Sequence, residues 1–171
     1  MQQTKITNHI IHLSKQFRGR DLDTLKEIMV WLNKNLKFKA YFAKKRSRTA
    51  DEILQSGIVT GCIDVALTFI VLARALKFDI TFVECIEKNW LTNKNIKDNI
   101  NGHIFCRVNL GKNIFIINPT EKTISDKEIY FNKNKEYVPI KEGNDSWDIG
   151  FINNNDLVKS LEKNYNIKFK V

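Results

Sequence analysis

The stretch that decides the fold runs from Gly61 to Leu76 and reads GCIDVALTFIVLARAL. Its apolar residues occupy almost every face of the helix that their spacing predicts, and a helix that is apolar all round is a buried one. We therefore expect a central helix here, with other elements packed on several sides. Cys62 lies in its first turn, where free backbone amides and the positive end of the helix dipole stabilise a thiolate. This position predicts a cysteine with a lowered pKa and raised reactivity.

Three shorter helices are predicted on the N-terminal side of this stretch. Apolar residues at helical spacing indicate helices over about Thr4–Phe17 and from Leu22 to Leu36. The sequence TADE at residues 49–52 fits a capping box, so a short helix should begin there and end near Gly57. Before it we expect an exposed basic connection, which contains Lys44, Lys45, Arg46 and Arg48.

The hydrophobic period changes from helical to alternating after the central helix. The polar stretch Lys88–Asn101 interrupts this pattern and reads as a loop, and Asn155–Asn164 reads as a closing helix. Helices followed mostly by strands predict an α+β fold, and we expect one domain over residues 1–171. Strands are expected at Asp79–Glu87, His103–Leu110 and Ile114–Ile117, with further candidates at Glu128–Phe131 and Glu136–Ile140.

His103 and Asn118 come together if the strands that carry them form a hairpin. With a turn at Gly111-Lys112, Asn118 is the diagonal same-face neighbour of His103; with a turn at Leu110-Gly111, the two face each other directly. A three-residue turn would instead place them on opposite faces of the sheet. In either two-residue register, the Asn118 amide oxygen can accept from the His103 ring and fix its orientation. The other ring nitrogen would then be free to take the proton of Cys62.

Taken together, these motifs resemble the core of the transglutaminase-like superfamily, whose members are papain-type thiol enzymes. The resemblance implies an α+β fold in which N-terminal helices and a buried helix carrying Cys62 pack on an antiparallel sheet. It also implies that Cys62 is the nucleophile, that His103 is the general base and that residue 118 orients the base. The family usually has Asp in that last place, where this chain has Asn118. The resemblance covers residues 48–120 and is carried by RTADEIL at 48–54, GCIDVA at 61–66, GHIF at 102–105 and NPT at 118–120.

The chemistry implied by the resemblance is attack of Cys62 on an amide or peptide carbonyl, which forms a thioester. Water would then give hydrolysis and an amine would give transamidation, with no cofactor or metal. Tyr41 and Gln55 are candidates for a second oxyanion donor beside the Cys62 amide, and Asp64 reads as structural. The alternative is a weak or inactive binding module that keeps the fold, because Asn118 lacks the charge that stabilises an imidazolium.

The composition excludes several other classes of protein. The chain has 171 residues and a net charge of +9, but its lysines are scattered and no nucleic-acid motif accompanies them, so nucleic acid is not an expected partner. Its longest apolar run, Ala66–Ala73, is too short to cross a membrane. Three cysteines without a C-x-x-C pair indicate neither a disulfide framework nor a zinc site and favour the reducing cytoplasm. The acidic residues of the C-terminal part have no calcium-ligand spacing; they are Asp145, Asp148 and Asp156.

Overall fold

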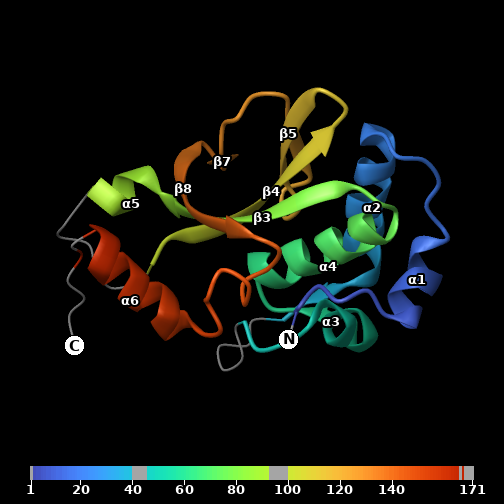
Figure 1. Ribbon diagram of the computed structural model, residues 1–171, viewed down its shortest axis with the longest axis horizontal. Coiled ribbons are helices and arrows are strands. Elements are labelled where there is room, and N and C mark those ends of the chain that lie inside the picture. Colours follow the sequence, from blue (N-terminus) through green and yellow to red (C-terminus); the bar gives the residue numbers. More distant parts are fainter. Residues whose placement is uncertain (1, 40–45, 93–99, 166, 168–171) are drawn as a thin grey trace.

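The apolar helix α4 (Cys62–Ala75) lies against one face of an antiparallel sheet, and the three helices that precede it in the chain pack on its other sides. A computed structural model describes residues 2–39, 46–92, 100–165 and 167 of the chain. Figure 1 shows three helices gathered around α4 at one end of the sheet and a fourth, α6, on the same side towards its other end. The remaining helices are α1 (Asn8–Ser14), α2 (Leu22–Asn35), α3 (Ala50–Ser56), α5 (Lys88–Thr92) and α6 (Asn154–Tyr165).

Six strands form the main sheet, in the order β6-β5-β4-β3-β8-β7, and every neighbouring pair is antiparallel. A separate pair, β1 (Lys37–Phe38) and β2 (Ile58–Val59), runs parallel beside α3. The main sheet consists of β3 (Asp79–Glu87), β4 (Gly102–Leu110), β5 (Asn113–Asn118), β6 (Thr123–Ser125), β7 (Phe131–Asn132) and β8 (Lys135–Gly143).

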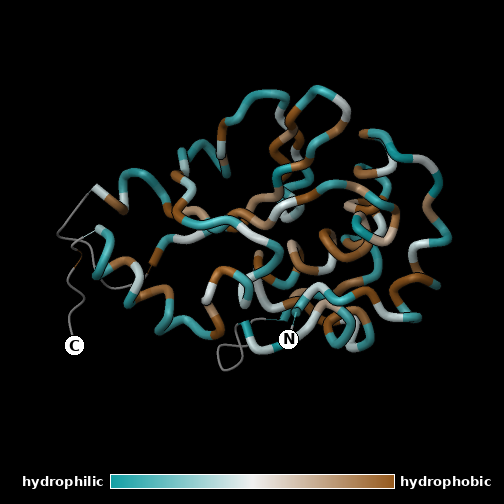
Figure 2. Tube along the Cα trace, in the orientation of Figure 1, coloured by the Kyte–Doolittle hydropathy of each residue, from teal (hydrophilic) through white to brown (hydrophobic). Residues whose placement is uncertain are grey.

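The core is divided by this sheet into two unequal parts. Alternate residues of β3 and β4, such as Phe82 and Ile104, face α4 and belong to the larger cluster. The opposite face carries a smaller cluster, which consists of Val83, Cys85, Phe105, Ile116, Tyr130 and Tyr137. Figure 2 shows hydrophobic residues along α4 and the strands next to it, whereas α6 alternates between polar and apolar positions. The fold is therefore α+β, as the sequence predicts.

Local signals explain where the helices begin and end. Thr49 accepts from the Glu52 amide while Glu52 accepts from the Thr49 amide, so the expected capping box is present at the start of α3. Gly57 follows this helix with φ of 65°, the left-handed conformation that favours glycine. Asp21 caps α2 by accepting from the Thr24 amide at 2.9 Å.

Four expectations from the sequence are wrong in detail. The first helix is confined to Asn8–Ser14, because Thr7 accepts from the Ile10 amide and starts the helix later than its apolar spacing suggests. The polar stretch after β3 opens with the helix α5, whose Trp90 is buried. Residues 128–130 are not a strand, and β7 begins only at Phe131. Arg46 is buried, whereas Lys44 and Lys45 lie outside the described residues.

Replacing Thr49 with Ala should lower the free energy of unfolding by about 1 kcal/mol, because the Glu52 amide loses its side-chain acceptor. Urea denaturation followed by circular dichroism measures this change. Thr49→Ser is the matched control, since it keeps the hydroxyl and should retain most of the stability. Equal losses in the two variants would contradict a capping role for the hydroxyl.

Candidate functional site

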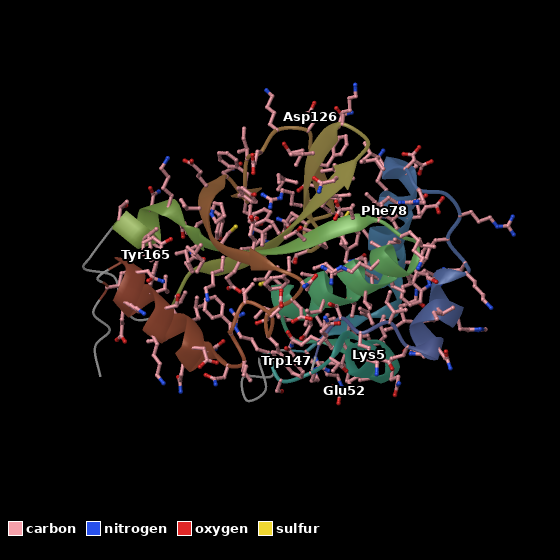
Figure 3. All side chains as sticks on the ribbon, in the orientation of Figure 1. Lys5, Glu52, Phe78, Asp126, Trp147 and Tyr165 are labelled. Carbon is pink, nitrogen blue, oxygen red and sulfur yellow. The ribbon has the colours of Figure 1, made fainter. Side chains whose placement is uncertain are left out.

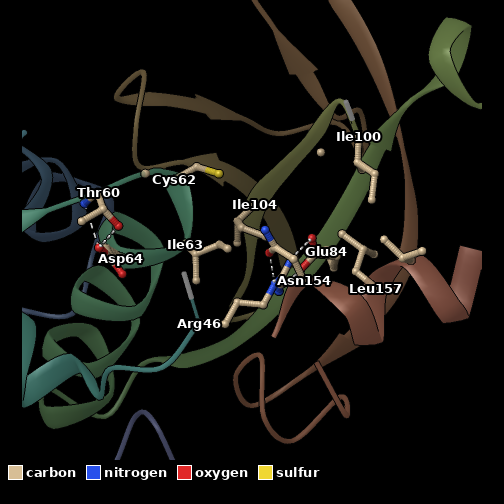
Figure 4. Close-up of a pocket in the computed structure, with 13 residues that line it drawn as sticks. Arg46, Thr60, Cys62, Ile63, Asp64, Glu84, Ile100, Ile104, Asn154 and Leu157 are labelled. Atoms are coloured by element: carbon tan, nitrogen blue, oxygen red, sulfur yellow. Dashed lines mark hydrogen bonds and ion pairs between the residues drawn. The ribbon is translucent and has the colours of Figure 1, made fainter. Parts of the chain in front are cut away.

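The turn before α4 is held in place by Asp64, and this positions Cys62 as the first residue of the helix. Asp64 Oδ2 accepts from the Thr60 backbone amide and from the Thr60 hydroxyl, both at 2.8 Å (Figure 4). The same carboxylate forms an ion pair with Arg48. Asp64 is buried, and these bonds give it the structural role expected from the sequence, including the bond to a loop amide.

His103 and Asn118 are joined by a hydrogen bond across the β4–β5 hairpin. Leu110 pairs with Asn113, so the turn is Gly111-Lys112 and His103 and Asn118 are diagonal neighbours, the first of the two expected registers. The distance from His103 Nε2 to Asn118 Oδ1 is 2.9 Å. Both residues are buried, at 5% and 2% exposure respectively.

The tautomer of His103 follows from the partners of Asn118. Asn118 Oδ1 also accepts from the Glu121 backbone amide at 3.3 Å, so this atom is the carbonyl oxygen of the side chain. The ring must then carry its proton on Nε2 in order to donate to Asn118. Nδ1 is left as an acceptor, and Asn132 Nδ2 lies 3.4 Å from it. The nitrogen that a general base would use is therefore unprotonated in the neutral ring.

Aromatic rings surround the imidazole of His103. Phe105 packs edge-on against it with ring centroids 5.0 Å apart, and Tyr137 lies at 5.7 Å. Burial lowers the pKa of His103, and the hydrogen bond to Asn118 opposes this shift. The ring is thus favoured in its neutral form, which is the form that accepts a proton.

Cys62 and Ile104, the residue after His103, line one cavity on the α4 side of β4. The His103 ring packs against Phe105 and Tyr137, which belong to the smaller cluster on the opposite face. Among the described residues, no hydrogen bond joins the thiol to the His103 ring, so the structure brings His103 and Asn118 together and shows no contact of Cys62 with either.

The pKa of Cys62 differs from the sequence-based expectation. Cys62 as a whole is half-buried, and burial of its thiol raises the pKa to about 11; the Glu84 carboxylate adds to this rise. The amides of Ile104 and Ile63 act in the opposite direction but are outweighed. The expectation of a lowered Cys62 pKa is therefore wrong. The shifts favour a neutral Cys62 thiol and a neutral His103 ring.

A cavity of about 360 Å³ opens beside Cys62 on the α4 side of the sheet (Figure 4). Its walls come from α4, β4 and α6, and its floor includes the side chains of Arg46 and Glu84. Among the described residues, the lining consists of Arg46, Thr60, Gly61, Cys62, Ile63, Asp64, Glu84, Ile100, Gly102, Ile104, Asn154, Leu157 and Val158.

Arg46 and Glu84 form a fully buried ion pair at this floor. The two guanidinium nitrogens Nη1 and Nη2 donate to the two carboxylate oxygens at 2.8 Å each, and Nη1 also donates to Ser146 at 2.8 Å. The Arg46 carbonyl accepts from Trp147 Nε1 at 2.6 Å and from Gln3 Nε2 at 3.0 Å. These bonds link Arg46 to the N-terminal segment and to the segment after β8, where Figure 3 labels Trp147. The sequence did not predict the pair of Arg46 and Glu84. The one signal for it is Glu84, an acidic residue inside an apolar strand.

The remaining candidates from the sequence lie away from the cavity. Gln55 is exposed on α3 and is not among the described residues that line the cavity, and Tyr41 lies outside the described residues. Cys85 and Cys106 are buried in β3 and β4, as expected of structural cysteines. The acidic residues considered for calcium accept hydrogen bonds from their neighbours; they are Asp145, Asp148 and Asp156.

Two further kinds of feature are absent from the described part of the chain. Residues 2–39, 46–92, 100–165 and 167 contain no group of three or more His, Cys, Asp or Glu side chains placed to hold a metal ion. No helix in the same ranges has the length and apolar character needed to cross a membrane.

The family model of the transglutaminase-like superfamily matches residues 11–119, which include Cys62, His103 and Asn118. The chain belongs to this superfamily. Its fold resembles a crystal structure from Cytophaga hutchinsonii described as a putative cysteine protease, with a TM-score of 0.63 and 16% sequence identity. The likeness covers 86% of this chain and 48% of that one, so the superfamily member described here spans about half the length of its structural neighbour. No curated protein matches the chain in sequence.

Replacing Arg46 with Leu should lower the free energy of unfolding by about 3–5 kcal/mol, because Glu84 is left buried and unpaired. The double variant Arg46→Leu, Glu84→Leu removes both charges and should recover much of that loss. Urea denaturation measures both values.

The exposed ion pair of Lys88 and Glu136 provides the matched control, because both side chains are about half exposed to water. Lys88→Ala should change the stability by less than about 1 kcal/mol. A double variant at residues 46 and 84 that is no more stable than Arg46→Leu alone would contradict the pairing argument.

Proposed function

We propose that this superfamily member is a thiol-dependent hydrolase, a protease or amidase, that cleaves an amide or peptide bond through a thioester on Cys62. The observation that carries the proposal is the hydrogen bond between His103 and Asn118, in a chain whose Cys62 begins a buried helix. It leaves His103 Nδ1 as a proton acceptor, and the next residue, Ile104, lines the cavity with Cys62. Cys85 pairs with His103 across β3 and β4, but Cys85 and Cys106 are both fully buried, whereas Cys62 borders the cavity.

The proposed reaction begins when the Cys62 thiol gives its proton to His103 Nδ1 and the sulfur attacks the carbonyl carbon. The C=O double bond becomes a C–O⁻ single bond, and the amides at the start of α4 stabilise the negative oxygen. His103 then gives the proton to the leaving amine, the C–N bond breaks and a thioester forms. Water attacks the thioester after losing a proton to His103, which releases the acid and restores the thiol. An amine in place of water gives transamidation.

In this proposal proton transfer accompanies the attack and does not precede it. A Cys62 pKa of about 11 and a lowered His103 pKa both disfavour a resting thiolate–imidazolium pair. Asn118 orients the ring without adding charge, so it is a positioning residue for His103. A bound substrate excludes water and places its carbonyl carbon at the Cys62 sulfur. Proton transfer from Cys62 to His103 then becomes favourable as the new C–S bond forms.

The second candidate function is a binding module that keeps the fold without catalysis. It is favoured by the same raised pKa and by the position of Asn132, which contacts the nitrogen of His103 that a base would use. The two candidates differ in whether His103 controls the reactivity of Cys62.

The first test is alkylation of Cys62 by iodoacetamide between pH 6 and pH 11, followed by peptide mass spectrometry. In His103→Ala the rate should rise only towards pH 11, which is the behaviour of a buried thiol without a base. The unmodified protein should show an additional reaction at lower pH, at least about tenfold faster at pH 7.5. Cys85 and Cys106 serve as internal controls and should react only after unfolding. Identical pH profiles in the two proteins would rule out the enzyme and leave the binding module.

Replacing Asn118 with Asp should raise the pKa of His103 and accelerate alkylation of Cys62 near pH 7, because a carboxylate stabilises the imidazolium. The change gives up no hydrogen bond, since Asn118 Nδ2 is buried without a partner in the described residues. The His103 pKa is measured by NMR titration of the ring protons. Asn118→Ala is the control, and it should slow alkylation because the ring loses its fixed orientation. A His103 pKa unchanged by Asn118→Asp would argue against direct coupling of the two side chains.

A further inference from the structure

We propose that the cavity beside Cys62 binds a neutral, aliphatic side chain on the acyl side of the cleaved bond. This inference rests on the proposed function, because it names the substrate that the site accepts. Cys62 is itself part of the cavity lining. The acyl part of a substrate is the part bonded to the sulfur in a thioester, so it lies at the cavity entrance, whereas the amine departs.

The size of the cavity suits a side chain of this kind. Its volume of about 360 Å³ lies at the lower end of the range found for small-ligand pockets, roughly 300–1,000 Å³. Gly61 contributes to the same lining, and a Cβ at this position would meet no other atom within 4 Å. The approach to Cys62 is therefore open on the side of the preceding residue.

Four aliphatic side chains form part of the cavity wall, beside the polar residues Thr60, Asp64 and Asn154. Ile63 comes from α4, Ile104 from β4, and Leu157 and Val158 from α6, so three separate elements present branched side chains to one space. Figure 4 shows Ile63, Ile104 and Leu157 arranged around it. Burial of an aliphatic side chain against these residues is favourable because it removes apolar surface from water.

The floor of the cavity disfavours charged side chains of either sign. Glu84 would attract a cation, but both of its oxygens already accept from Arg46. Arg46 would attract an anion, but Glu84 already neutralises it. Asp64, the remaining charged group among the described lining residues, accepts from Thr60 and pairs with Arg48. A charged side chain would therefore lose its hydration without gaining an unpaired opposite charge from these residues.

The test compares the labelling of Cys62 by three peptidyl chloromethyl ketones that differ only in the residue next to the ketone, which is Leu, Lys or Glu. Each rate constant is divided by that for iodoacetamide, which carries no such side chain. The Leu reagent should label Cys62 at least about tenfold faster than either charged reagent. In each reaction with a chloromethyl ketone the thiol loses its proton, and the sulfur displaces chloride and forms one new C–S bond.

Charge-swapped variants of the cavity wall sharpen this comparison. Val158 is partly exposed in the wall, so Val158→Glu should raise the relative rate of the Lys reagent and Val158→Lys that of the Glu reagent. Lys159→Glu is the matched control on the exposed face of the same helix and should leave the three ratios unchanged.

The outcomes separate the inference from the proposed function. Equal labelling by the three reagents, with iodoacetamide labelling that still depends on His103, would overturn the aliphatic preference and leave the thiol hydrolase standing. Failure of every reagent, including iodoacetamide, to label folded protein would overturn both. The comparison on the unmodified chain decides between these outcomes even where a Val158 variant does not fold.

Discussion

Helix α4 has almost no polar face to turn towards water, and the rest of the molecule is arranged to cover it. The sheet covers one side through β3 and β4, while α1, α2 and α3 cover others. The start of the helix remains accessible, because Gly61 and Cys62 border a cavity, and its last turn is also partly exposed. The same burial that fixes the helix therefore selects the one cysteine that a substrate can reach.

The electrostatics of the site are set by low dielectric more than by helix geometry. Four amides at a helix start favour a thiolate, but burial and the Glu84 carboxylate outweigh them at Cys62. Burial also favours neutral His103. An Asp in place of Asn118 would shift this balance, so the neutral amide is consistent with a site that is uncharged at rest and develops charge only with a carbonyl bound.

The sequence predicts the elements whose signals are local. The bounds of β3 match the expected ones, α4 differs from its expected range by one residue at each end, and the capping box at Thr49 is present. The sequence left two two-residue turns and a three-residue turn open for the hairpin, and the observed Gly111-Lys112 turn is the one that makes His103 and Asn118 diagonal neighbours. The features that could not be predicted depend on partners distant in the sequence. Arg46 belongs to a basic cluster typical of a surface, and its burial depends on Glu84, which is 38 residues away.

The contacts of Arg46 have a consequence for the order of folding. Its carbonyl and guanidinium bind Gln3, Glu84, Ser146 and Trp147, partners from 38 to 101 residues away along the chain. Closing such long loops is slow, so this ion pair must stay hydrated until the C-terminal part docks. A nascent chain that lacks Ser146 and Trp147 therefore lacks two of the partners that bury Arg46. We expect the native packing around this ion pair to form only after these residues are synthesised, and not helix by helix.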